Sequence, residues 1–309
     1  MTPIIRTVRG DIAPHELGIC AMHEHLLGRP PAPFDDEQDL VLDDVQAVQT
    51  DIRQFQQAGG QALVEMTPID YGRNIVGLAQ IAQACDVHIV AVSGFLKEKF
   101  ARNWLIDQSP HILSQRLITD ITLGVDGTPY RAGLLKAASS LHQITPLEQT
   151  AFVAAALAHH ATGAAISTHT EAGTMAHAQV DLLTQYEVPV ERIIIGHCDR
   201  LLDLEHHKSL LHRGVTIGYD QIGKPKYASD TVRAAMIAEL CAAGFAQQLV
   251  ISCDIARRSG LRGYGYDDAP SYVHLIRDFV TRLREAGVSE AHITQMLISN
   301  PVRLLSIGV

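Results

Sequence analysis

Six side chains that could bind or bridge metal ions stand at the ends of short apolar runs in this sequence. They are His23, His25, Lys136, His169, His197 and Asp254. Imidazole and carboxylate suit Zn²⁺ or Mn²⁺, and the absence of thiolates among the six argues against a structural zinc site. His23 and His25 are two residues apart, so on a strand both side chains point to the same face. The pattern predicts a metal site of imidazole and carboxylate ligands.

Lys136 is the unusual member of this set. It lies in the apolar segment AGLLKAASS, where no neighbour in sequence offers a partner, and it is one of only six lysines. Burial favours the neutral amine and so lowers the pKa of a lysine. A neutral lysine can take up carbon dioxide to become a carbamate, whose two oxygens can bridge two cations. The alternative is a lysine that extends to solvent, but the surrounding candidate ligands favour the bridging role.

Short apolar runs alternate with helical patterns along the whole chain. The eight runs cover residues 18–25, 62–68, 87–95, 133–139, 165–170, 192–199, 215–220 and 249–255. Helical patterns cover segments such as 43–58, 73–84, 146–161, 173–187, 229–243 and 271–286. This alternation predicts an α/β fold in which eight parallel strands close into a (β/α)8 TIM barrel. The rival is an open doubly wound sheet, but no G-x-G-x-x-G follows a strand to support it.

The active site of such a barrel lies at the C-terminal ends of its strands, where the six candidates are expected. Their spacing places them on the first, fourth, fifth, sixth and eighth strands. Glu24, Cys198 and Cys253 alternate to the opposite face, and we interpret them as structural residues. Because no linker or low-complexity segment divides the chain, we expect one domain over residues 1–309.

Composition excludes several classes of protein. Hydrophobic residues make up 47% and charged residues 19%, which is typical of a globular chain and not of a disordered one. A net charge of -9 argues against a nucleic-acid scaffold. The five cysteines are odd in number and widely scattered, so no disulfide framework is expected. With no apolar stretch long enough for a membrane span and no signal-like N-terminus, we expect a cytoplasmic protein without a membrane partner.

The motifs around the candidate ligands resemble those of the phosphotriesterase family of the amidohydrolase superfamily, over essentially the whole chain. The resembling segments are TVRGD, CAMHEHLL, DGTPYRAGLLKAAS, STHTEAGT, IIIGHCDR and ISNPVRLL. The resemblance implies a distorted barrel that holds two divalent metals, zinc or manganese, bridged by hydroxide and a carbamylated lysine. It implies that His23, His25 and Asp254 bind one metal and that His169 and His197 bind the other. Lys136 would then bridge both, and Asp254 would carry the proton from the attacking hydroxide to the leaving group.

Cationic side chains in the loops indicate an anionic small-molecule substrate. Lys224, Lys226 and Tyr227 follow the seventh strand, Arg257 and Arg258 follow the eighth, and Lys97 follows the third. Loops after the last two strands of a barrel commonly bind phosphate, and arginine binds it bidentately. The segments GFLKEKF and DIARR resemble the branch of the family that opens phosphorylated sugar lactones. The continuation SGLRGYGYDD departs from that branch.

Other functions remain open on the same metal centre. An N-acyl amino-acid or N-acyl sulfonate amidohydrolase would use the same ligands and the same cations. A neutral organophosphate triester would gain nothing from the cations, and the single Trp104 offers little aromatic surface for its leaving group. A non-catalytic metal-binding protein is the third alternative. The sequence leaves open the lactone, the metal and the oligomeric state, including a homodimer.

Overall fold

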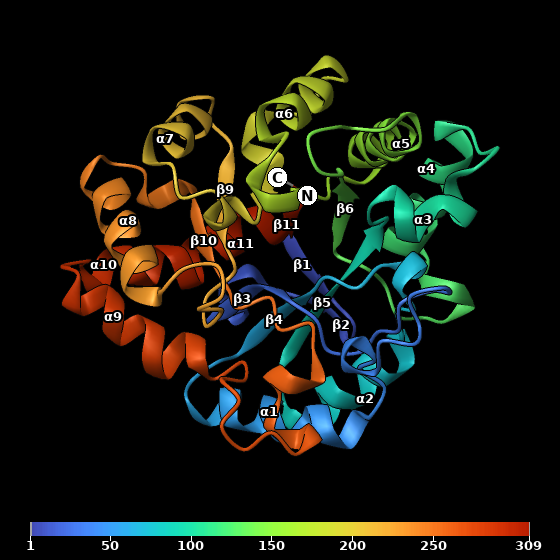
Figure 1. Ribbon diagram of the computed structural model, residues 1–309. Coiled ribbons are helices and arrows are strands. Elements are labelled where there is room, and N and C mark those ends of the chain that lie inside the picture. Colours follow the sequence, from blue (N-terminus) through green and yellow to red (C-terminus); the bar gives the residue numbers. More distant parts are fainter. Residues whose placement is uncertain (1, 309) are drawn as a thin grey trace.

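The protein, described here from a computed structural model over residues 2–308, is built on eight parallel strands that form a nearly closed barrel (Figure 1). In chain order the strands are β3 (Cys20–Glu24), β4 (Ala62–Glu65), β5 (His88–Gly94), β6 (Leu134–Ala138), β7 (Ile166–His169), β8 (Ile193–Gly196), β9 (Thr216–Tyr219) and β10 (Leu249–Ile251). Each pairs with the next in sequence, which is the order a barrel requires. The predicted fold class is confirmed.

The seam between β10 and β3 is joined largely by side chains. The backbone N–H of His23 donates to Ser252 Oγ at 2.9 Å, and the N–H of Asp254 donates to the His23 carbonyl at 3.0 Å. The buried Glu24 carboxylate accepts hydrogen bonds from the Ser252 hydroxyl and from the N–H groups of Cys253 and Ile255, at 2.7 to 2.9 Å. Glu24 therefore has the structural role expected for it, and it fixes the backbone on both sides of Asp254.

Helices surround the barrel and begin and end where local sequence favours it. The longer ones are α1 (Val45–Gln57), α2 (Ile75–Cys85), α3 (Glu98–Leu105), α4 (Pro110–Thr122), α5 (Pro146–Thr162), α6 (Ala176–Gln185), α7 (Leu204–His212), α8 (Asp230–Ala242) and α9 (Val280–Glu285). In α5, Thr145 and Glu148 form a capping box, Pro146 occupies the first turn and Gly163 ends the helix in a left-handed conformation. The helix therefore begins at the capping threonine and proline and ends at the glycine, where local sequence preferences favour a start and an end.

A small antiparallel sheet covers the N-terminal end of the barrel. It joins β1 (Ile4–Thr7) to β2 (Gly10–Ile12) and to β11 (Ser306–Ile307), so the two ends of the chain lie together (Figure 1). Ile5 packs with Leu304 and Leu305, from α11 (Asn300–Leu305), against residues inside the barrel. These apolar side chains close the end opposite the candidate ligands.

Several elements differ from the sequence-based expectation. The eight predicted strands all form, but each ends one to four residues earlier than predicted, so that some of the predicted strand-end residues follow the strand instead. The predicted helix over 271–286 begins with a π-helical turn at Leu275. Helices α3, α4, α11 and α10 (Glu290–Thr294), like the small sheet, were not anticipated. Within residues 2–308, the helices are all too short or too polar to cross a bilayer.

Candidate active site

The six predicted metal-site residues meet at the C-terminal ends of the strands. His23 and Lys136 lie within β3 and β6, and His169 is the last residue of β7; His25, His197 and Asp254 follow β3, β8 and β10. The Nε2 atoms of His25 and His23 lie 3.2 and 3.8 Å from Asp254 Oδ1. The His197 ring lies 4.7 Å from His23 and 4.5 Å from His169, centroid to centroid. Residues far apart in sequence therefore form one cluster.

Two of the candidate ligands have an unusual backbone conformation. His197 has φ of 59° and Asp254 has φ of 49°, both in the left-handed region that L-residues seldom adopt. Each follows a strand that ends earlier than the apolar run suggests. Such strain persists only where the surrounding structure holds it. Here the hydrogen bonds of Glu24 hold the segment around Asp254.

Asp220 orients one histidine from each half of the cluster. Its carboxylate accepts from His197 Nδ1 at 2.6 Å and from the His197 backbone at 2.9 Å, and it lies 3.4 Å from His23 Nδ1. His25 Nδ1 similarly contacts Thr67 Oγ1 at 2.7 Å. Because Nδ1 is engaged in each ring, Nε2 is left for a metal. The sequence analysis missed Asp220, although it ends the seventh predicted strand.

The donor set fits divalent metal ions. Nε2 of His23 and Nε2 of His169 are buried without a hydrogen-bond partner, which is costly unless another group satisfies them. Burial lowers the pKa of both imidazoles well below the usual value, which favours the neutral form that binds metal. His23, His25 and Asp254 bring candidate ligand atoms within 4.8 Å of one another and could together hold an ion. His23, His197 and Asp220 are equally close, but there Asp220 faces the Nδ1 atoms that it orients.

Lys136 is buried at the floor of the cluster, with 1% of its surface exposed. Its Nζ donates to the Met66 carbonyl at 2.8 Å. Burial lowers the pKa of Lys136 to about 8, although the nearby Asp254 and Glu65 carboxylates partly oppose that effect. The neutral amine that a carbamate requires is therefore far more populated near neutral pH than in an exposed lysine, although the ammonium form still predominates.

Asp254 is held by two side chains from the loop after β9. Lys224 Nζ lies 2.6 Å from Asp254 Oδ2, and Gln221 Nε2 donates to the same oxygen at 2.8 Å. Burial alone would raise the pKa of Asp254, but the Lys224 ammonium and the hydrogen bond from His25 hold it well below the usual range. The carboxylate is therefore ionised and able to bind a metal or accept a proton. Gln221 was not anticipated from the sequence.

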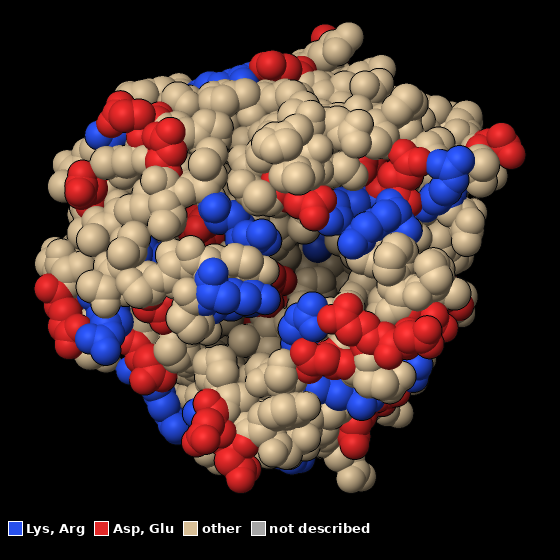
Figure 2. All heavy atoms as spheres, viewed as in Figure 1, with Lys and Arg blue, Asp and Glu red and all other residues tan. Residues whose placement is uncertain are grey.

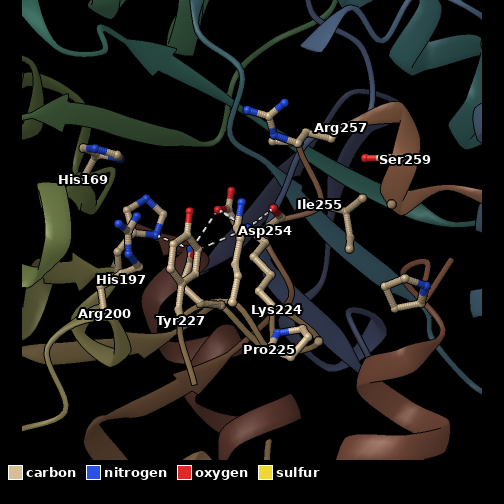
Figure 3. Close-up of a pocket in the computed structure, with 16 residues that line it drawn as sticks. His169, His197, Arg200, Lys224, Pro225, Tyr227, Asp254, Ile255, Arg257 and Ser259 are labelled. Carbon is tan, nitrogen blue, oxygen red and sulfur yellow. Dashed lines mark hydrogen bonds and ion pairs between the residues drawn. The ribbon is translucent and has the colours of Figure 1, made fainter. Parts of the chain in front are cut away.

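A pocket of about 430 Å³ opens above the cluster, and its wall is cationic (Figure 3). His169, His197 and Asp254 line it together with the basic residues Arg200, Lys224, Lys226 and Arg257. The Arg200 guanidinium lies 3.9 Å from the centre of the Tyr227 ring, and Lys226 Nζ lies 4.8 Å from it. Figure 2 shows Lys and Arg side chains gathered around this hollow.

Not all predicted substrate-binding residues reach this pocket. Arg258 donates to the Val41 carbonyl and to Asp43, and Lys97 is buried in an ion pair 2.7 Å from Glu171. Neither lines the pocket, whereas Lys224, Lys226, Tyr227 and Arg257 do. Arg258 is drawn away because acidic residues before α1 pair with the loop after β10. Arg200 was missed, although it stands only three residues after His197.

Comparison with known proteins identifies the family. A model of the phosphotriesterase family matches residues 3–305. The chain belongs to this family. The predicted resemblance is thereby confirmed, and the chain is a hydrolytic enzyme of a metal-dependent family with candidate metal-binding residues in place.

Three proteins that are similar to this chain along most of its length illustrate the comparison. A lactonase from Listeria monocytogenes is 35% identical, with a TM-score of 0.94 and 98% of each chain covered. The phosphotriesterase homology protein from Escherichia coli, with phosphate in its active site, is 32% identical, with a TM-score of 0.90 over 94% of this chain and 99% of that one. A phospho-furanose lactonase of Mycoplasmopsis synoviae is 28% identical over 97% of this chain and 91% of its own.

Proposed function

We propose that this protein is a lactonase that opens the ring of a lactone bearing a remote phosphate, a phosphorylated sugar lactone. The observation that carries the proposal is the single pocket wall that joins candidate metal ligands to Lys224, Lys226 and Arg257. The chain as a whole has a net charge of -9, so cations gathered at the pocket are not a consequence of overall composition. The lactonase and phospho-furanose lactonase names of two relatives, and the phosphate in the third, support the same substrate class.

Two divalent cations, zinc or manganese, complete the proposed site. His23, His25 and Asp254 would hold one and His169 and His197 the other, with Lys136 as a carbamate between them. The cations supply Lewis acidity at the scissile carbonyl and lower the pKa of water, so that a nucleophile forms near neutral pH. The carbamate arises when the neutral Nζ of Lys136 bonds to the carbon of carbon dioxide and releases a proton, which gives the side chain two oxygens that share one negative charge.

Asp254 is the proposed proton carrier. Its carboxylate is ionised and faces the pocket, where it can accept the proton of the attacking water. Transfer of that proton to the ring oxygen lets the bond between this oxygen and the carbonyl carbon break, which yields a hydroxyl group and a carboxylic acid. The acid then releases the second proton of the water to solvent and becomes a carboxylate. Gln221, which donates to Asp254 Oδ2, orients the carboxylate and cannot itself ionise.

The basic wall would bind the phosphate. Lys224, Lys226 and Arg257 come from the loops after β9 and β10, and Arg200 adds a fourth cation beside Tyr227. In the substrate-free structure Lys224 pairs with Asp254, and Arg257 pairs with Glu37 at 2.6 Å and Asp39 at 3.1 Å. Arg200 and Lys226 instead contact the face of the Tyr227 ring, an uncharged partner, so their charges are available to an anion.

A substrate panel tests the proposal. We expect kcat/KM for a phosphorylated lactone to exceed that for its unphosphorylated analogue, because each charge-assisted hydrogen bond contributes about 1.5–3 kcal/mol, or about ten- to a hundredfold. Lys226→Ala and Arg257→Ala should reduce turnover of the phosphorylated lactone alone. N-acetyl amino acids, N-acetyl sulfonates and an aryl phosphotriester complete the panel. Preferred turnover of one of these, or equal losses on both lactones, would refute the phosphate assignment.

The carbamate has its own test. Lys136→Ala should lose metal and activity, and a short carboxylic acid should partly restore both by replacing the bridging oxygens. Lys136→Arg serves as the comparison, because a guanidinium keeps the charge and cannot form a carbamate. Wild-type activity in Lys136→Arg would exclude the carbamate.

A further inference from the structure

A fully buried arginine lies beneath the loop that lines the basic side of the pocket. Arg233 is on α8, with 0% of its surface exposed, and it has the largest of the fully buried side chains in residues 2–308. Its Nε donates to Asp199 Oδ2 at 2.7 Å, and both partners of this ion pair are completely buried. A buried guanidinium destabilises the fold unless its N–H groups donate hydrogen bonds. The residues that accept these hydrogen bonds are therefore the segments that Arg233 fixes in place.

The other acceptors of Arg233 belong to residues 221–230. It donates to the Ala228 carbonyl at 2.6 Å and to the Lys224 carbonyl at 3.5 Å. It also donates to Asp230 Oδ1 at 3.3 Å, an oxygen that accepts the N–H of Gly223 as well. Arg233 therefore holds the middle and the end of the loop after β9.

Asp199 holds the beginning of the same loop. Its two carboxylate oxygens accept the N–H of Asp220 at 3.3 Å and the N–H of Gln221 at 3.0 Å. Asp220 orients His197 and His23, and Gln221 donates to Asp254. The Arg233–Asp199 pair thus connects residues that orient the metal ligands to the segment that carries the pocket cations Lys224 and Lys226.

We propose that the buried Arg233–Asp199 pair is a positioning device that fixes the distance between the bound anion of the substrate and the metal ligands. This inference rests on the proposed function, since it assigns the anion to the loop after β9. With that loop held at its start, middle and end, the enzyme selects substrates by the number of bonds between phosphate and scissile ester. A shorter or longer spacer places the carbonyl away from the ligands when the phosphate is bound. Arg233 and Asp199 are positioning residues, because neither lines the pocket.

The test compares Arg233→Lys with wild-type protein on lactones whose phosphate is separated from the ring by one, two or three methylene groups. A misplacement of about 1 Å can cost about a hundredfold in rate, so we expect a sharp optimum for the wild type. Lysine keeps the charge but cannot reach all four acceptors. The ratio of kcat/KM between the best spacer and the other spacers should therefore fall by about tenfold or more. The kcat for an unphosphorylated lactone and the bound metal per chain should stay within about twofold, because the Asp199 carboxylate that accepts from Asp220 and Gln221 is kept in this variant.

A second measurement, limited proteolysis, reports how firmly the loop after β9 is held and needs no substrate. Trypsin can cut after Lys226 but not after Lys224, which precedes Pro225. Arg233→Lys should be cut after Lys226 several times faster than wild type. Arg213→Lys is the matched control, because Arg213 forms an ion pair of 2.6 Å with Asp181 outside the site. The double variant Asp199→Asn/Arg233→Met removes both charges together and provides the measurement if Arg233→Lys does not fold.

The outcomes separate the two proposals. Cleavage after Lys226 at the control rate, with an unchanged spacer optimum, overturns the positioning role. Equal losses of kcat/KM on every lactone in Arg233→Lys, together with loss of metal, also overturn it. The pair would then stabilise the whole C-terminal end of the barrel and not the loop after β9 alone. Wild-type protein that prefers no phosphorylated lactone refutes the anion assignment in the proposed function, and faster cleavage in Arg233→Lys would still show that the pair anchors the loop.

Discussion

Asp220 orients a histidine in each half of the candidate metal centre, His197 in one and His23 in the other. We expect Asp220→Asn to weaken metal binding by about ten- to a hundredfold, because loss of a carboxylate behind a metal-binding histidine has this effect. His197 Nδ1 and His23 Nδ1 contact different oxygens of the carboxylate, and an asparagine amide replaces one of these oxygens with a donor. Metal retained after dialysis against graded chelator measures the change. Asp181→Asn, a change to an exposed carboxylate paired with Arg213, is the control, and equal retention in the two variants would contradict the role of Asp220.

Asp70 provides a pH test at a single buried carboxyl. It is 3% exposed and accepts the N–H of Leu96 at 3.1 Å, and burial raises its pKa to about 7, against the effect of that hydrogen bond. The unfolded chain ionises near the ordinary value of about 4, so ionisation costs stability increasingly between about pH 4 and pH 7. Above pH 7 the cost is constant, and below pH 4 it is absent.

Asp70→Asn removes this cost. The stability of the variant relative to wild type should therefore be greater at pH 8 than at pH 4.5. Its free energy of unfolding, minus that of wild type, should be larger at pH 8 by on the order of a few kcal/mol. Urea unfolding of metal-free protein at the two pH values measures the difference. Because any packing penalty of the amide applies at both values, a relative stability that does not change with pH would contradict the raised pKa.

At the scale of elements, the approach of β5 to β6 beside Lys136 allows no side chain at Gly94. Gly94 has φ of 152°, and a Cβ there would lie 1.9 Å from the Lys136 carbonyl oxygen. Gly94→Ala should therefore push the strands apart at the candidate ligands and destabilise the fold by about 3 kcal/mol or more. Thermal unfolding and the metal bound per chain both report this change.

Gly244 is the matched control for Gly94. It follows α8 with φ of 89°, and a Cβ there would meet nothing within 4 Å. Gly244→Ala should cost only the conformational penalty of about 1–2 kcal/mol and leave metal binding unchanged. If the two variants were equally stable and bound metal equally, the close approach at Gly94 would not be what requires glycine.

At the scale of the whole molecule, metal binding should stabilise the fold because the candidate ligands come from distant parts of the chain. His23 and Asp254 lie near opposite ends of the sequence, and ions that bind only the folded arrangement favour it by mass action. Metal at a hundred times its dissociation constant would add about 2.7 kcal/mol. We expect Tm to fall with chelator and to rise with added Mn²⁺ or Zn²⁺. An active protein whose Tm responds to neither would contradict a metal centre built from these residues.

The eight strands and the candidate ligands could be predicted from the sequence because both depend on local signals. Apolar runs of strand length record burial on both faces, and a parallel barrel places the end of every run at the same face. His169 and His197 could therefore be expected together without knowing any distance. The strand ends were less accurate, since His197 and Asp254 adopt left-handed conformations that apolar runs do not reveal.

What only the tertiary structure decided is which loop side chains meet. Lys224 and Arg258 look alike in sequence, yet one reaches Asp254 and the other is held by Asp43. Arg233 gave no sequence signal, and the position of Asp220 at a predicted strand end did not reveal its role, because both roles depend on partners from other parts of the fold. The hydrophobic pattern of a strand is read within a few residues, whereas an ion pair forms only where folding brings two distant segments within about 4 Å. The sequence by itself therefore determined the barrel and the candidate ligands at one end of it, and the packing of the loops decided how those side chains are oriented and which cations face the pocket.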